Sequence, residues 1–181
     1  DVKLALVGAG YISDVHAEAL KGVDNIILSA VIDPNIAAAE ALAKRHSIPV
    51  ATADMKACLT QTDIDCAHIL VPPPVHEAVA REWISQGISV LLEKPMGVSN
   101  AECEALIRLA EAKKAALGVN QNFVYHPAFR RLKTVIEAGE IGRLNMVNCV
   151  FSMPLRQLDA GQLGHWMFAD LGNILLEQAV H

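Results

Sequence analysis

A lysine stands between an apolar run and a proline near the middle of the chain, in the stretch SVLLEKPMG. Ser89–Leu92 is typical of a buried strand, and Glu93, Lys94 and Pro95 follow without the Gly, Asn or Asp that often begins a turn. The strand end holds Lys94 rigidly, and Pro95 fixes the exit of the chain and permits a cis bond. Beside another positive charge the ammonium form of a lysine is disfavoured, so that Lys94 could exchange a proton with a bound hydroxyl group. A simple salt bridge at the strand end is the alternative that the tripeptide leaves open.

A glycine-rich stretch, GAGYIS, begins at Gly8 between the first apolar run and the first helical pattern. Gly8 permits a tight turn, and Gly10 lets the backbone approach a pyrophosphate that is bound at a helix N-terminus. Ser13 stands at the third small position, where Gly is usual, so the fingerprint is incomplete. An ordinary glycine-rich turn is the alternative, but the position at the start of an alternating series favours nucleotide binding.

An aspartate, Asp33, ends the second apolar run, roughly where an acidic ligand of the adenosine ribose is expected, about 20 residues after the turn. A carboxylate there accepts hydrogen bonds from the ribose hydroxyls and repels a 2′-phosphate. The basic residues Lys44 and Arg45 lie at the far end of the next predicted helix. The sequence therefore predicts NAD rather than NADP, with capping of the helix that begins at Pro34 as the alternative role for Asp33.

Strand-like and helix-like segments alternate along most of the chain, as in a doubly wound parallel sheet with right-handed crossovers. A longer run at residues 144–153 is predicted to be a strand of a second, open sheet, and the chain ends in a predicted helix at residues 174–181. The strands of the first sheet are expected at residues 3–7, 26–33, near 50, 65–71, 89–93 and 116–120, and the helices at 11–21, 34–45, after Asp54, and at 75–86, 100–114 and 127–138.

Composition restricts the classes of partner. The formal net charge is −5 and no dense cluster of Lys and Arg occurs, so we expect no nucleic-acid partner. No apolar run approaches the ~18 residues that a membrane span needs. The first apolar run begins at Val2, which leaves no room for a signal peptide, and the 4 cysteines form no CxxC pair. We therefore expect a cytoplasmic protein with reduced thiols.

Several stretches together resemble the Gfo/Idh/MocA family of oxidoreductases: GAGYIS, HAEAL, VPPPVH, LLEKPMG, GVNQNFVYHPAFRRL and GNILLEQAVH. The resemblance implies an α/β fold, with an NAD-binding Rossmann domain over residues 1–121. Residues 122–181 are then the beginning of an α+β open-sheet domain that holds substrate and mediates homo-oligomerisation. Members of this family are considerably longer, so we expect the second domain to be incomplete and the isolated chain to be a poor catalyst.

The resemblance also implies roles for individual residues. Lys94 falls on the catalytic lysine, His181 on a proton shuttle and Glu177 on a residue that orients substrate, and a spacing of four places these last two on one helical face. Glu177 stands where Asp is more usual, and an ordinary helical Glu–His pair is the alternative. We expect no metal, and we expect cofactor contacts from Gly8, Gly10, Tyr11, Ile12, Asp33, Val71, Pro72, His76, Glu93, Lys94 and Asn122.

The sequence itself qualifies two of these expected contacts, those of His76 and Asn122. Taken alone, His76 is better explained as an ordinary residue at the start of a helix. Phe123 and Val124 stand after Asn122, where many relatives carry a basic pair, which puts a contact with an anionic substrate in doubt.

The predicted function is that of an NAD-dependent dehydrogenase that acts on CH–OH groups. It would transfer a hydride between nicotinamide and a carbinol carbon of a sugar, cyclitol or related polyol. A dinucleotide-binding sensor without turnover is the first alternative. A protein that binds S-adenosylmethionine in the same fold is the second.

Overall fold

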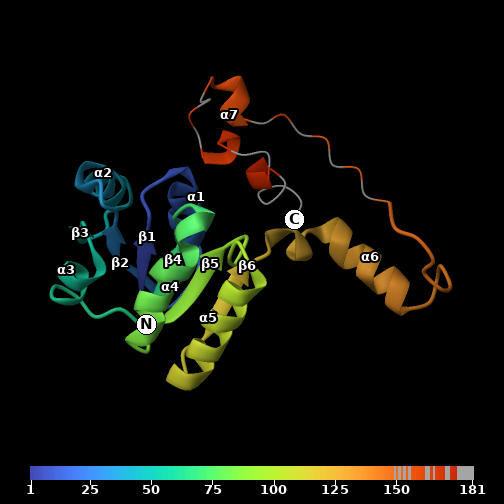
Figure 1. Cartoon of the computed structure of the whole chain (residues 1–181), viewed down its shortest axis with the longest axis horizontal. Coiled ribbons are helices and arrows are strands. Elements are labelled where there is room, and N and C mark those ends of the chain that lie inside the picture. The colour runs from blue at the N-terminus through green and yellow to red at the C-terminus, as the bar shows by residue number, and fades with distance from the viewer. Residues whose placement is uncertain are drawn as a thin grey trace. The chain divides into compact units, whose positions relative to one another are not determined.

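The computed structural model describes residues 1–148, 150, 152, 154, 156–161, 164, 166–169 and 172–174. Contacts divide the chain into two compact units, Asp1–Asn120 and Gln121–His181. The division falls one residue before the boundary that the sequence predicts. The first unit contains a parallel sheet with helices on its faces (Figure 1).

The sheet of the first unit has six strands in the order β3-β2-β1-β4-β5-β6, and all neighbouring pairs are parallel. This is the strand order of the dinucleotide-binding Rossmann fold, which confirms the predicted fold class. The order reverses between β1 and β4, and ligands of such sheets bind outside the carboxyl ends of the strands at that point. The strands are β1 (Val2–Val7), β2 (Ile26–Ile32), β3 (Val50–Thr52), β4 (Cys66–Ile69), β5 (Ser89–Glu93) and β6 (Leu117–Asn120).

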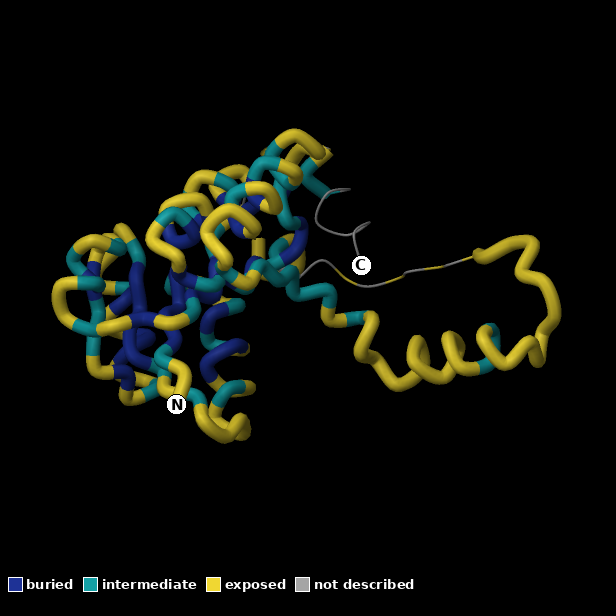
Figure 2. Tube along the Cα trace, turned by 90° about the horizontal axis from the view of Figure 1, so that it is seen from below, coloured by how far each residue is buried: buried dark blue, intermediate teal, exposed yellow. Residues whose placement is uncertain are grey.

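The core lies on both faces of this sheet, because successive side chains of a strand point to opposite sides. From β1, Leu4 and Leu6 pack into one buried cluster with residues of α1 (Tyr11–Leu20) and α2 (Ile36–His46). Ala5 and Val7 pack into a second cluster, with residues of α3 (Met55–Leu59), α4 (His76–Ser85) and α5 (Asn100–Lys113). The two clusters form the dark-blue interior of this unit in Figure 2.

Local capping explains where three of these helices begin. The Asn35 side chain accepts a hydrogen bond from Ala38 N–H, so α2 begins after Asn35, two residues later than the predicted start at Pro34. Asp54 caps α3 and Ser99 caps α5 through their side chains, as the sequence predicts. A short 3₁₀ helix, η1 (Pro73–Val75), leads directly into α4.

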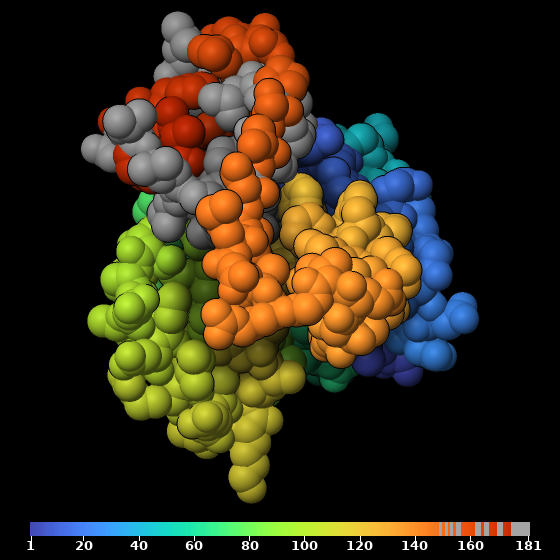
Figure 3. Space-filling model, turned by 90° about the vertical axis from the view of Figure 1, so that its right-hand side faces the viewer, coloured from blue at the N-terminus to red at the C-terminus, as the bar shows by residue number. Residues whose placement is uncertain are grey.

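The second unit contains η2 (Asn122–Tyr125), α6 (Pro127–Glu137), α7 (Arg156–Asp159) and η3 (Trp166–Phe168). The strand predicted over residues 144–153 is not found among its described residues, where Met146 is 82% and Val150 is 85% exposed. A strand needs a hydrogen-bonded neighbour, and the described part of this unit offers none. The residues after α6, orange in Figure 3, instead form a narrow extended run. The helix predicted over residues 174–181 lies outside the described residues except for Ile174.

Among the described residues, no helix combines the length and the apolar character that crossing a bilayer requires.

Candidate functional site

Gly8 lies where β1 leaves the sheet, next to the loop that follows β4. Its φ is 103°, and a Cβ atom there would lie 2.8 Å from the Leu70 carbonyl oxygen. Gly8 N–H donates to the Ile32 carbonyl at 2.7 Å, and the buried Ser13 hydroxyl donates to the Gly8 carbonyl at 2.7 Å. The turn therefore excludes a side chain at Gly8, and the serine at the third small position closes it with a hydrogen bond.

Gly10 is the residue before α1, with an ordinary φ of −80°. A Cβ atom built at Gly10 would meet no atom within 4 Å, so this part of the turn has open space above its backbone. The first amide groups of a helix lack partners within the helix, and its dipole favours negative charge there. The beginning of α1, where Tyr11 is 63% exposed and Ile12 half-buried, thus fits the diphosphate of a dinucleotide.

The carboxylate of Asp33 joins the glycine-rich turn to the beginning of α2. Oδ2 accepts a hydrogen bond from Ala9 N–H and Oδ1 accepts one from Asn35 N–H, both at 2.8 Å. Asn35 itself caps the helix, so Asp33 is not the capping residue. Because each carboxylate oxygen can accept more than one hydrogen bond, Asp33 retains capacity for ribose hydroxyls.

Lys94 follows the last residue of β5 at the same edge of the sheet, and it is 9% exposed. Its backbone N–H donates to Oε2 of Glu93 at 3.2 Å. The peptide bond between Lys94 and Pro95 is cis.

A buried polar network surrounds the side chain of Glu93. Oε1 of Glu93 lies 2.6 Å from Nδ2 of Asn120 and 3.0 Å from Nε2 of His16. Nδ1 of His16 lies 3.0 Å from Nδ1 of His68, and the two rings meet edge to face. The network thus connects α1, β4, β5 and β6.

The charges of this network follow from its contacts. Burial is the largest influence on Glu93 and acts to raise its pKa, but the hydrogen bonds that the carboxylate accepts outweigh burial and lower the pKa. Burial, followed by the charge of His16, lowers the pKa of His68 to about 4. At neutral pH Glu93 is therefore a carboxylate and His68 is uncharged. Since a carboxylate only accepts hydrogen bonds, Nε2 of His16 carries the proton that it shares with Glu93.

His76 is fully buried at the beginning of α4. Its Nδ1 lies 2.7 Å from the Pro95 carbonyl oxygen, and its Nε2 lies 2.7 Å from the Val71 carbonyl oxygen. The ring therefore connects the loop after β4 with the segment that follows β5, next to Lys94 in the chain.

A family model described as "Oxidoreductase family, NAD-binding Rossmann fold" matches residues 2–121. The chain belongs to the Gfo/Idh/MocA oxidoreductase family. The match covers the sheet, the glycine-rich turn and Lys94.

Two solved structures and one curated protein illustrate this membership. The inositol 2-dehydrogenase of Rhizobium meliloti (strain 1021) is 34% identical over 146 residues, which are 81% of this chain and 44% of that protein. The crystal structure of GenD2 from gentamicin A biosynthesis, in complex with NAD, gives a TM-score of 0.73 at 29% identity and covers 77% of this chain and 40% of GenD2. The crystal structure of a putative myo-inositol dehydrogenase from Sinorhizobium meliloti 1021 gives a TM-score of 0.70 at 32% identity. The match covers 78% of this chain and 43% of that chain. The chain spans less than half the length of each of these relatives.

The sequence motifs of the Gfo/Idh/MocA family point to some of these residues and miss others. Gly8, Gly10, Asp33, Glu93 and Lys94 meet at one edge of the sheet, as do Val71, Pro72 and His76. Asn122 is exposed in η2 of the second unit, and Glu177 and His181 lie outside the described residues.

Sequence reasoning missed His16, His68 and Asn120. His16 begins the HAEAL stretch, and His68 is a polar residue within an apolar strand. Either signal could have drawn attention to the network. Asn120 ends β6 directly opposite Glu93 in the register of β5 and β6, a relationship that becomes visible only once the strand order is known.

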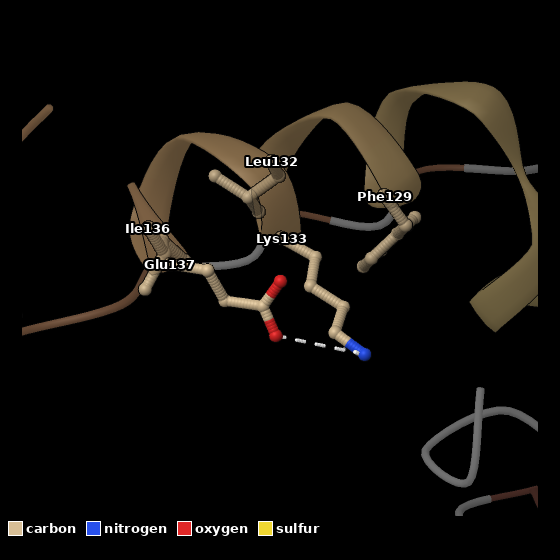
Figure 4. A pocket seen from close by; sticks show the side chains of 5 residues that line it. All are labelled: Phe129, Leu132, Lys133, Ile136 and Glu137. Atoms are coloured by element: carbon tan, nitrogen blue, oxygen red, sulfur yellow. Dashed lines mark ion pairs between the residues drawn. The ribbon is translucent and has the colours of Figure 1, made fainter. Parts of the chain in front are cut away.

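In the second unit, a shallow apolar hollow lies along α6 (Figure 4). It is lined by residues of that helix alone: Phe129, Leu132, Lys133, Ile136 and Glu137. Lys133 and Glu137 form an ion pair across 3.7 Å. No group of three or more potential metal ligands occurs in the part of the chain that the structure describes.

Proposed function

We propose that this chain is the coenzyme-binding part of an NAD-dependent dehydrogenase that acts on a CH–OH group of a sugar, cyclitol or related polyol. The observation that carries the proposal is that Lys94 leaves the sheet at the same edge as the glycine-rich turn. Two curated relatives support the substrate class by their names, the inositol 2-dehydrogenase and a D-apiose dehydrogenase from Paraburkholderia graminis that is 25% identical over 140 residues.

The residues of the turn supply the contacts that NAD requires. The open space at Gly10 and the first amides of α1 receive the diphosphate, and Tyr11 and Ile12 border it. The Asp33 carboxylate binds the adenosine ribose hydroxyls and repels a 2′-phosphate, which favours NAD over NADP. NAD, when bound, supplies the hydride acceptor or donor for the carbinol carbon.

Lys94 exchanges the proton of the reacting hydroxyl in this proposal. When the alcohol is oxidised, the hydroxyl proton leaves as the carbonyl forms, and the neutral amine of Lys94 accepts it. In the reverse direction the ammonium returns that proton to the oxygen. His181 would then pass the proton to solvent, and Glu177 would orient the substrate.

The second unit is proposed to hold the substrate and to mediate homo-oligomerisation, because all the proposed coenzyme contacts except Asn122 lie in the first unit. Among the described residues, Cys58, Cys66 and Cys103 are free thiols. This state, together with use of NAD, supports a cytoplasmic location.

Substitution of Lys94 tests the proposal. We expect a version of the protein that carries a complete substrate domain to change the nicotinamide absorbance with at least one member of a panel of inositols and aldoses. Lys94→Arg keeps the charge but does not exchange protons near neutral pH, so we expect kcat to fall about 10²–10⁴-fold. The affinity for NADH, measured by fluorescence titration, should stay within about threefold, since Lys94 is not required to hold the diphosphate or the ribose.

Lys113→Arg is the matched control, because it makes the same change at an exposed position of α5. Equal activity of the Lys94→Arg variant and the parent protein would refute the role of Lys94. Tight NADH binding without turnover of any panel member, by a version that carries a complete substrate domain, would favour the dinucleotide-sensing alternative.

A further inference from the structure

The two oxygens of the Glu93 carboxylate have different partners. Oε1 accepts hydrogen bonds from the side chains of His16, at 3.0 Å, and Asn120, at 2.6 Å. Oε2 accepts the backbone N–H of Lys94, at 3.2 Å. We propose that His16 and Asn120 are positioning residues for Lys94 that act through this carboxylate. The inference rests on the proposed role of Lys94 in proton transfer.

The geometry couples the two ends of the carboxylate. A carboxylate is rigid and planar, so donors that hold Oε1 also determine where Oε2 lies. Asn120 holds Oε1 from β6, the neighbouring strand, and His16 holds it from α1. Oε2 in turn fixes the direction of the peptide N–H of Lys94, and with it the backbone from which the lysine side chain projects.

Burial makes this coupling strong. The side chains of His16 and Glu93 are only 9% and 12% exposed. Water has little access to replace a lost donor, and a buried carboxylate without its donors moves toward other partners or toward solvent. His68 completes the arrangement, because its Nδ1 lies 3.0 Å from Nδ1 of His16 and fixes the orientation of that ring.

The network also links the lysine to the coenzyme turn. His16 is on the same helix whose first residues, Tyr11 and Ile12, border the proposed diphosphate site. A shift of α1 would therefore be transmitted to the peptide N–H of Lys94 through the side chain of His16 and the carboxylate of Glu93.

Exchanging donor and acceptor provides the test. Asn120→Asp replaces the donor by a carboxylate that faces the carboxylate of Glu93, which breaks the contact. The double variant Glu93→Gln/Asn120→Asp reverses it, because the amide introduced at position 93 donates to the carboxylate introduced at position 120. The oxygen of that amide still accepts Lys94 N–H, and the formal charge of the pair is the same as in the parent protein. His16 can adapt by accepting at Nε2 and donating from Nδ1 to His68.

The first readout is the protection of the Lys94 amide proton against hydrogen exchange, measured by NMR, which requires no catalytic activity. We expect Asn120→Asp to lower protection roughly tenfold or more, as loss of a hydrogen bond to a charged group would. We expect the double variant to restore most of it. Asn100→Asp, the same change at an exposed position, should leave it unaltered. Should Asn120→Asp fail to fold, Asn120→Ala removes the donor without adding charge and is judged by the same measure.

The second readout separates positioning from simple structural support. With a substrate that the parent protein turns over, we expect Asn120→Asp to lower kcat about tenfold or more, with KM and the NADH affinity nearly unchanged. The double variant should recover kcat. Unchanged Lys94 protection in a folded Asn120→Asp variant would overturn the inference, as would a double variant that restores neither protection nor kcat. If even a version with a complete substrate domain turns over no panel member, the proposed function fails, whereas the exchange measurement still decides whether the network positions Lys94.

Discussion

The hydroxyl of Ser13 donates to the carbonyl of Gly8 across 2.7 Å, so that the first turn of α1 is bonded to the end of β1. Both groups lie at the junction between β1 and α1. A glycine at the third small position would pack closely but could not make this bond. Ser13, which departs from the usual glycine fingerprint, therefore adds a hydrogen bond that glycine could not make.

Ser13→Ala removes that donor while it preserves the small size of the buried residue. We expect the free energy of unfolding to fall by about 1 kcal/mol, the net value of a typical buried hydrogen bond. Urea denaturation measures the change. Ser85→Ala, in a half-buried position of α4, should change stability by no more than about 0.5 kcal/mol. Equal effects of the two substitutions would contradict the importance of the Ser13 contact.

Gly8 and Gly10 are expected to respond differently to alanine. At Gly8 the new Cβ meets the Leu70 carbonyl oxygen at 2.8 Å with φ at 103°, so we expect a loss of at least about 2 kcal/mol of stability. At Gly10 no atom lies within 4 Å, so the fold should lose less than about 1 kcal/mol.

The same Gly10→Ala substitution fills the space proposed for the diphosphate. We expect the Kd for NADH to rise about tenfold or more, measured by fluorescence titration. Unimpaired NADH binding by a folded Gly10→Ala variant would argue against the diphosphate position.

Asp33→Asn is expected to change the preference between NADH and NADPH. Loss of the charge removes the repulsion of a 2′-phosphate, and we expect the ratio of the two Kd values to move toward NADPH by roughly tenfold. Weakening of the bonds to Ala9 N–H and Asn35 N–H affects both cofactors and largely cancels in the ratio. Asp24→Asn, an exposed change of the same charge, is the control. A ratio that does not move would remove the basis for expecting NAD.

Stability should depend on pH through His68. Its pKa is lowered from 6.5 to about 4, chiefly by burial and then by the charge of His16, while the charge of Glu93 acts in the opposite direction. Between these values the unfolded chain binds a proton at His68 that the folded chain does not, so lower pH favours unfolding. We expect the stability difference between the parent protein and His68→Gln to shrink by up to about 3 kcal/mol as pH falls from 6.5 to 4.

Urea denaturation at a series of pH values measures that difference. The lowered pKa of Glu93 also reduces stability as pH falls below 4.5, but Glu93 is present in both proteins, so this loss largely cancels in the difference. A difference that stays constant from pH 6.5 to 4 would show that His68 does not remain uncharged in the folded state.

Much of the first unit follows from the sequence, because its strands are short apolar runs covered on both faces. β5 is predicted at its observed bounds, and Ser99 caps the helix that the sequence assigns to it. The start of α2 was misplaced because Pro34 and Asn35 both signal a helix beginning, and the side-chain cap of Asn35 decides between them. The run at residues 144–153 has the alternation of a strand, but alternation does not supply the neighbour that a strand needs.

The candidate site likewise contains some residues that the sequence predicts and others that only the structure reveals. Gly8, Asp33 and Lys94 belong to local patterns, each readable within a few residues of a strand end. The contact between His16 and Asn120 spans 104 positions, and it exists because β5 lies next to β6 and places Glu93 between them. Local sequence patterns do not specify that adjacency, so the network emerges only from the assembled sheet.

The glycine-rich turn, Asp33, Lys94 and the whole Glu93 network belong to the unit Asp1–Asn120. Under the proposed function, the groups that form the coenzyme turn and hold Lys94 in place are therefore all encoded in one contiguous segment of the chain. A different downstream segment could then change the substrate while this segment still supplied the proposed coenzyme contacts and Lys94.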